Sequence, residues 1–299
     1  MTVEHACARA VHKPWGKTDL RPWSEVHENV PIGELWFERV DKDAPAPALL
    51  LKLLFTSEPL SIQVHPDDAF ARSMGLPHGK NEAWYIVAAT GGAHIALGLK
   101  KPLTHSQFRS SIKDGSIATL MAWHAVRGGD AIHVPAGTIH AIGAGLVIAE
   151  VQQRIDVTFR IFDHGRKREL QIDDAVAAAN LAPAELQKIP SFLAPGRSLL
   201  LTDPHFVLEH FDLSSESKWT LRAKCETWLL VLNGHAGVGS VNILPGEVLF
   251  VEDDRVEIMA GSAGLKGLVA YAAPAPDPDL LRSANVSDLG RADLAKEGT

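Results

Sequence analysis

Polar and apolar side chains alternate in the stretch from Ser61 to His65, where Ser61, Gln63 and His65 are polar and Ile62 and Val64 are apolar. Because successive side chains of a β-strand point to opposite faces, the pattern predicts a strand with one polar and one apolar face. A second apolar run begins just after Lys80 and Glu82. If that run lies beside the first strand, these polar side chains meet.

The same alternation recurs between Glu150 and Phe162, where the odd positions are apolar apart from Gln153. The polar residues at even positions are Glu150, Gln152, Arg154, Asp156, Thr158 and Arg160. Such a face is either solvated at the edge of a sheet or directed into a barrel, where acids and arginines form a substrate site. The pattern predicts one long strand and leaves both alternatives open.

Most of the remaining chain is typical of short strands separated by glycine and proline turns. Leu49 to Phe55 is an apolar run broken only by Lys52, as expected for a strand buried on both faces. The segment from Leu103 to Met121 starts with a capping box at Thr104 and predicts two short helices, the only ones expected before residue 170. The fold class is therefore mainly β with a few short helices.

The pattern predicts two domains, at residues 1–185 and 186–299. The first contains the polar strands and the helical insertion near 103–121, and a linker with little regular pattern runs from Pro183 to Pro204. A second series of closely spaced strands begins at Phe206, and it has no cluster of metal-ligand residues.

Composition excludes some classes of function. The 299 residues have 46% hydrophobic and 22% charged side chains, and the formal net charge of −7 offers no basic surface for nucleic acid or an anionic membrane. An anionic substrate would need a local cluster of Lys and Arg. Cys7 and Cys225 lie far apart, and the start of the chain lacks the apolar core of a signal peptide, so we expect a cytoplasmic protein.

Gln63, His65 and Glu82 are the first candidates for a metal site. A lone Gln-x-His on a strand is more often a half-buried hydrogen-bonded pair, so these residues alone leave the metal role open. His140 follows a turn built by a proline and a glycine, and His133 is a rival ligand.

The spacing Gly129-x5-Pro135-x-Gly137-x2-His140 resembles the second motif of cupins, in which a strand, turn and strand deliver one metal ligand into a small β-barrel. The usual asparagine four residues beyond the histidine is Ala144 here. In place of the first cupin motif, His-x-His and a later Glu, this chain has the Gln-x-His pair and its following glutamate.

Three further motifs follow one another in the chain: Gly-Lys-x-Glu-x-Trp-Tyr from Gly79, Gly-Thr-Ile-His at residues 137–140, and Glu-x-Gln-Gln…Asp-x-Thr-x-Arg-x-x-Asp from Glu150. With these motifs the sequence resembles type I mannose-6-phosphate isomerases in their short bacterial form. The resemblance covers roughly residues 13–174. It implies two cupin-like β-barrels, the second degenerate. Longer members often have histidine where this chain has Gly79, whereas the nearest histidine here, His78, stands one position earlier. The resemblance therefore does not assign the residue that opens the sugar ring.

The resemblance implies one zinc ion per chain. The implied zinc ligands are Gln63, His65, Glu82 and His140. The residues implied to bind substrate are Ser61, Lys80 and Arg160, and those implied to be catalytic are Arg160, Lys80, Glu150 and Asp156. The polar face of the 150–162 stretch is this same set, which favours the barrel interior over the solvated edge.

The implied reaction interconverts mannose 6-phosphate and fructose 6-phosphate by moving a proton between C1 and C2 through an enediolate. Glu150 and Asp156 are both candidate bases, with Lys80 and Arg160 balancing the developing charge. The alternatives are a cupin isomerase acting on another aldose, with or without a phosphate, and a sugar-phosphate-binding cupin without turnover. A cupin dioxygenase usually uses a histidine-rich iron site, which the Gln and Glu ligands disfavour. The oligomeric state stays open.

Overall fold

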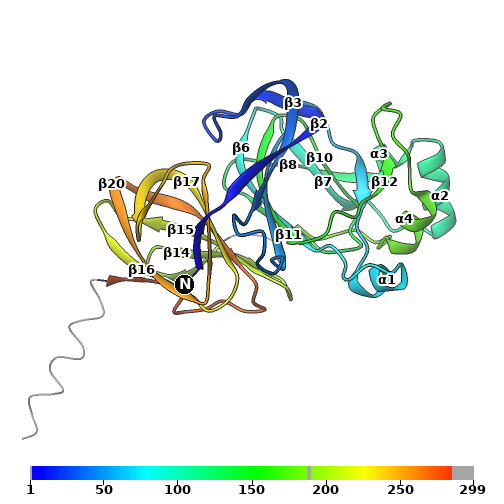
Figure 1. The fold of residues 1–299 in the computed structure, drawn as a ribbon. Coiled ribbons are helices and arrows are strands. Elements are labelled where there is room, and N and C mark those ends of the chain that lie inside the picture. Colours follow the sequence, from blue (N-terminus) through cyan, green and yellow to red (C-terminus); the bar gives the residue numbers. More distant parts are fainter. Residues whose placement is uncertain (1, 187–189, 285–299) are drawn as a thin grey trace, which may run out of the picture.

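The computed structural model describes residues 2–186 and 190–284, and every strand pairing in that part of the chain is antiparallel. The strands form three sheets, with four short helices beside them (Figure 1). The predicted fold class, mainly β with a few short helices, is confirmed. No helix in the described residues is long and apolar enough to cross a membrane.

Two sheets face each other in the N-terminal half. The six-stranded sheet has the order β2 (Cys7–Asp19), β3 (His27–Glu38), β4 (Leu49–Phe55), β11 (Leu146–Gln153), β6 (Glu82–Ala89) and β9 (Ala131–Val134). The five-stranded sheet has the order β12 (Phe159–Phe162), β5 (Ile62–Val64), β10 (His140–Ile142), β7 (His94–Leu99) and β8 (Met121–Ala125).

The third sheet has ten strands, and nearly all come from the C-terminal half. Its main path is β1 (Thr2–His5), β19 (Val248–Glu252), β17 (Thr227–Val238), β20 (Asp254–Tyr271), β15 (Val207–Leu213), β14 (Arg197–Thr202) and β13 (Ser191–Ala194). The strands off this path are β16 (Lys218–Ala223), β18 (Val241–Ile243) and β21 (Leu281–Ser283). The N-terminal strand β1 pairs with β19, so the chain starts in this sheet and then passes to the other half (Figure 1).

The helices lie at the end of the molecule farthest from the ten-stranded sheet (Figure 1). They are α1 (Asp68–Ser73), α2 (His105–Lys113), α3 (Ile117–Leu120) and α4 (Ile172–Ala178). The predicted capping box at α2 is confirmed, because the Thr104 side chain accepts from Gln107 N and the Gln107 side chain accepts from Thr104 N.

Three local predictions were wrong. The two helices expected within Leu103 to Met121 are not the only ones before residue 170, because α1 begins after Pro66, where the Asp67 side chain accepts from Phe70 N as an N-cap. The linker expected from Pro183 to Pro204 contains β13 and β14. The single strand expected over residues 150–162 is two strands, β11 and β12, which belong to different sheets.

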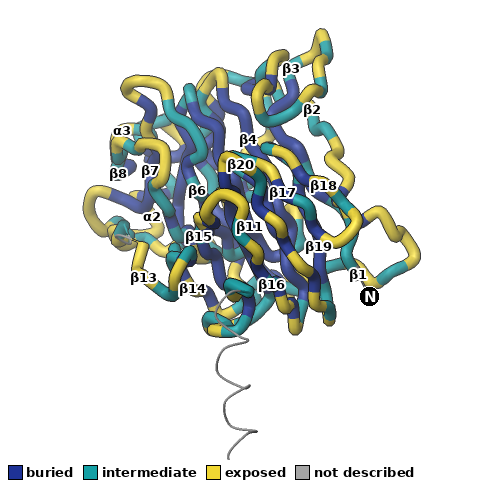
Figure 2. Tube along the Cα trace, turned by 90° about the vertical axis from the view of Figure 1, so that its left-hand side faces the viewer, coloured by how far each residue is buried: buried dark blue, intermediate teal, exposed yellow. Residues whose placement is uncertain are grey.

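One hydrophobic core joins the two halves. Aliphatic residues of β4 and β11, such as Leu51 and Val151, pack in the same cluster as Phe206, Trp228 and Phe250 of the C-terminal half. Figure 2 shows buried segments of β4, β11, β17 and β20 in the interior, with exposed residues at the turns. The division at residues 185/186 stays a prediction, but the halves share apolar surface that neither buries alone.

Candidate metal centre and substrate cavity

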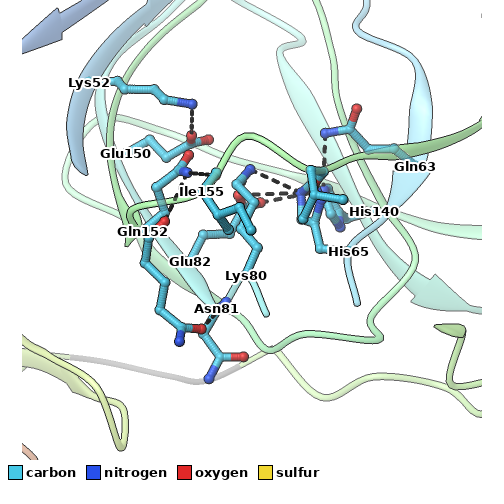
Figure 3. A network of polar contacts seen from close by, with 12 residues as sticks. Lys52, Gln63, His65, Lys80, Asn81, Glu82, His140, Glu150, Gln152 and Ile155 are labelled. Atoms are coloured by element: carbon cyan, nitrogen blue, oxygen red, sulfur yellow. Dashed lines mark hydrogen bonds and ion pairs between the residues drawn. The ribbon is translucent and has the colours of Figure 1, made fainter. Parts of the chain in front are cut away.

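Three strand ends bring the candidate ligands together. His65 follows β5 directly, Glu82 is the first residue of β6, and His140 is the first residue of β10. The pairing of β10 with β5 sets His140 opposite Gln63. One ligand atom from each of His65, Glu82 and His140 lies within 4.8 Å of the others, and all three residues are buried (Figure 3).

The hydrogen bonds of the two imidazoles fix which nitrogen faces the cluster. Nδ1 of His65 lies 2.8 Å from the carbonyl oxygen of Val157, and Nδ1 of His140 lies 2.8 Å from that of Thr138. Since a carbonyl oxygen only accepts, each Nδ1 carries the proton and each Nε2 presents a lone pair. These Nε2 atoms lie 3.5 and 3.3 Å from carboxylate oxygens of Glu82.

Burial keeps both imidazoles neutral. It lowers the pKa of His65 to about 3 and lowers that of His140 as well. Burial opposes ionisation of Glu82, but the Lys80 ammonium 2.6 Å away, together with His65 and His140, holds the pKa of Glu82 well below its usual value. Burial likewise opposes the charge on Lys80, but the negative charges of Glu82, Glu150 and Asp156 together raise the pKa of Lys80.

The donor set fits a divalent metal. Oε1 of Glu82 is buried without a hydrogen-bond partner among the residues that the structure describes, an arrangement that costs free energy unless a cation or water satisfies it. Nε2 of the Gln63 amide lies 3.3 Å from Nε2 of His140. Turning that amide by 180° exchanges its nitrogen and oxygen and adds a fourth ligand atom. Two nitrogens and two oxygens suit a borderline ion.

A cavity of about 250 Å³ adjoins this cluster. Ser61, Gln63, Lys80, Glu150, Asp156 and Arg160 all line it, so the structure brings the predicted substrate-binding and catalytic residues to one space. The charged residues of its wall are Lys13, Lys52, Lys80, Arg160 and Arg168, with Glu34, Glu150 and Asp156. Five cations against three acids give the local positive excess that an anionic substrate needs.

The two candidate bases differ in their surroundings. Glu150 is buried, and its carboxylate accepts from Trp84 Nε1 at 3.1 Å and lies 3.2 Å from Lys52 Nζ (Figure 3). Burial and the negative charge of Glu82 raise the pKa of Glu150 despite Lys52. Asp156 is exposed at the wall of the cavity.

The break between β11 and β12 separates the polar row that the sequence suggested. Nε2 of Gln152 donates to the Ile155 carbonyl at 2.6 Å and holds the turn (Figure 3). Arg154 leaves the row, because its Nε donates to the Leu49 carbonyl and the side chain is not part of the cavity wall. Arg160 stays with the cavity. Its Nη1 donates to the Glu169 carbonyl, and within the described residues its buried Nε has no hydrogen-bond partner.

His133 does not join the ligand cluster. It lies on β9 opposite Ala83, and its Nε2 is 2.9 Å from Oδ2 of Asp203. The structure also explains Gly79: a Cβ there would lie 2.4 Å from the Asp67 carbonyl carbon, so no larger residue fits. His78 hydrogen-bonds the Gly79 carbonyl and is not part of the cavity wall.

Sequence reasoning missed Lys52. Its ammonium is buried between Glu150 and Glu34, at 3.2 and 3.7 Å, and lies 4.6 Å from the ring centre of Trp36. A signal existed, since a single lysine within an apolar run must find a buried partner. The partners, however, lie on other strands of the sheet.

Comparison with known proteins gives relatives in sequence and in structure, although no family model matches the chain. The mannose-6-phosphate isomerase of Streptococcus mutans is 33% identical over 235 residues, which cover 73% of this chain and 71% of that protein. The crystal structure of the mannose 6-phosphate isomerase from Bacillus subtilis superposes with a TM-score of 0.78 at 22% identity, covering 91% of this chain and all of that one.

A further structure, described as a mannose 6-phosphate isomerase bound with zinc and yttrium, has a TM-score of 0.72 at 15% identity and covers 91% of this chain and 100% of its own. These structures share the fold, and the expected cupin-type β architecture is confirmed. The sequence relationship to the Streptococcus protein extends over more than two thirds of both chains. The chain therefore belongs to the mannose-6-phosphate isomerase family.

Proposed function

We propose that this enzyme interconverts mannose 6-phosphate and fructose 6-phosphate at a zinc centre formed by Gln63, His65, Glu82 and His140. The observation that carries the proposal is the convergence of three buried metal-ligand groups beside a cation-rich cavity. The names of the relatives in sequence and structure support the same reaction.

The donor chemistry supports zinc, and the related structure that contains zinc supports it further. When bound, zinc would orient and polarise the sugar oxygens. One set of four ligands in the described part of the chain accounts for one ion.

The cavity cations support a phosphorylated substrate. Arg160 and Lys80 face the same space as Ser61, so they can bind an anion and the hydroxyl groups near it. The buried Nε of Arg160 has no partner in the described part of the chain and is available to a substrate oxygen. Arg168 is less free, because it binds Asp163.

The reaction needs a base that removes the proton from C2 of the aldose and returns it to C1. Glu150 and Asp156 both line the cavity and are proposed for this role. The raised pKa of Glu150 makes it a stronger proton acceptor than an ordinary carboxylate. Lys80 and Arg160 stabilise the negative charge of the enediolate.

The first experiment measures turnover of mannose 6-phosphate with coupling enzymes, on protein as purified, after chelation and after addition of zinc. We expect activity that disappears on chelation and returns with zinc. Free mannose is the matched control, and it should react more slowly because it makes no use of the cavity cations. Binding of hexose phosphate without turnover, or faster turnover of free mannose, would contradict the proposal.

We propose the cytoplasm as the location of the enzyme. The supporting observation is that Cys7 and Cys225 are both free thiols in the structure. Fractionation of cells that produce the protein tests this, and recovery outside the cytoplasm would contradict it.

A further inference from the structure

The C-terminal half contributes a buried carboxylate to the surroundings of the metal centre. Asp203 follows β14 and is only 3% exposed. Its Oδ2 lies 2.9 Å from Nε2 of His133, and its Oδ1 accepts from Nδ2 of Asn81 at 3.4 Å. Both partners belong to the N-terminal half, so Asp203 connects the ten-stranded sheet to the six-stranded sheet.

Asn81 lies between Lys80 and Glu82 in the sequence, and its side-chain amide and its backbone N all form hydrogen bonds. Its Oδ1 accepts from Ala136 N at 2.7 Å, and its own N donates to Oε1 of Gln153 at 2.9 Å. In Figure 3 it lies below Lys80 and Glu82, away from the histidines. The amide therefore links the start of β6 to the turn that precedes β10.

That turn sets the position of His140. It runs from the end of β9 to the start of β10, and Gly137 N donates to the His65 carbonyl at 2.8 Å. His133, on β9 before the turn, is the other partner of Asp203. One carboxylate thus holds both the segment that leads to Glu82 and the strand that leads to His140.

The loop that carries Asp203 is itself well anchored. Asp203 N donates to the Phe206 carbonyl at 2.8 Å, and His205 N donates to Asp203 Oδ1 at 2.9 Å. The Phe206 side chain is fully buried in the core shared by the two halves. The carboxylate therefore has a rigid support outside the strands it contacts.

We infer that Asp203 is a positioning residue for the metal centre, acting through Asn81 and His133 to keep Glu82 and His140 at their ligand separation. This inference rests on the proposed function, because it assigns a role in a metal site. It also gives the C-terminal half a part in the reaction, although Asp203 does not line the cavity. Partners beyond the direct ligands typically set metal affinity by fixing ligand orientation.

The test uses the full chain with Co²⁺ as a spectroscopic probe in place of zinc. Asp203→Ala should bind Co²⁺ about tenfold more weakly in competition with a chelator and should change the visible absorption of the bound ion. Asp212→Ala is the matched control, since Asp212 is an exposed aspartate of the same half whose side chain forms an ion pair with the exposed Lys266. It should match the wild-type protein in both measurements.

Thermal unfolding of the metal-free variants separates positioning from general stability. If Asp203→Ala does not fold, Asp203→Asn, which keeps the volume and one acceptor oxygen, replaces it and should give a smaller change of the same sign. A folded variant with wild-type Co²⁺ affinity and spectrum overturns the inference, even if it melts earlier. Wild-type protein that binds no Co²⁺ would instead overturn the proposed function, and the inference with it.

Discussion

At the scale of single residues, burial decides the chemistry of the site. His65 and His140 stay neutral because they are buried, and their Nδ1 hydrogen bonds leave both Nε2 lone pairs directed at the cluster. Glu82 and Lys80 stay charged because each compensates the other in the same buried space. Lys52 also lies 3.2 Å from the carboxylate of Glu150, but there burial and the charge of Glu82 prevail and the pKa of Glu150 is raised.

Replacing Lys52 tests whether Glu150 is the base. Lys52 lowers the pKa of Glu150, so Lys52→Met should raise it further. A base acts when deprotonated, so kcat/KM rises with pH through this pKa, and the variant's acid limb should move to higher pH by about one unit. The measurement is the pH profile of kcat/KM for both proteins.

Lys13→Met is the control for this change, because Lys13 lines the cavity but pairs with Glu34, at 3.3 Å, rather than with Glu150. Its acid limb should stay at the wild-type pH. An unshifted limb in a folded Lys52→Met protein would favour Asp156 as the base instead.

At the scale of elements, three of the four candidate ligands, His65, Glu82 and His140, lie at strand ends, while Gln63 is the central residue of β5. The segments that lead into β6 and β10 are loops, whose geometry depends on glycine and on side-chain hydrogen bonds. The helices lie at the far end of the catalytic half, where they cover the apolar side of the five-stranded sheet with residues such as Phe108, Ile112 and Val176. Their stability should therefore affect the fold more than the site.

The capping box of α2 provides a test of that separation. Thr104→Ala removes the acceptor for Gln107 N and should lower the free energy of unfolding by about 1 kcal/mol. We expect kcat/KM for mannose 6-phosphate to remain unchanged. Ser116→Ala is the matched control, since Ser116 precedes α3 without a capping hydrogen bond from its side chain. Urea unfolding measures both, and equal stability of the two variants would contradict the prediction.

At the scale of the whole molecule, apolar packing and hydrogen bonds join the two halves. They share a hydrophobic cluster, and Glu226 of the C-terminal half accepts hydrogen bonds from Ala48 N and Leu49 N at the start of β4. Burial raises the pKa of Glu226, although these hydrogen bonds oppose the shift. Because the carboxylate accepts from two backbone amides, it fixes the start of β4, the strand that carries Lys52.

The fragment 1–185 tests how far the halves depend on each other. Without Trp228, Phe250 and their neighbours, the apolar side chains of β4 and β11 that pack against them lose their cover. We expect the fragment to lack a cooperative thermal transition and to bind a hydrophobic dye, as measured by circular dichroism and fluorescence. A cooperative transition close to that of the full chain would show that residues 1–185 fold alone.

The fold class, the capping box and the types of the candidate ligands all follow from local patterns in the sequence. Each of these depends on side-chain chemistry within a few residues: alternation in strands, a threonine before a helix, and donor atoms at motif spacing. Recognition of the family motifs then gave each residue an expected role. The break within residues 150–162 escaped this reasoning, because alternation continues across a turn that depends on a hydrogen bond from Gln152.

Which of these side chains meet depends on how the strands pair in the folded chain. Lys52 and Glu150 lie about a hundred positions apart and become neighbours through the pairing of β4 with β11. His133 has the chemistry of a ligand, yet the register of β9 on β6 directs it to Asp203. Strand register and burial are set by long-range packing, so no local pattern specifies them.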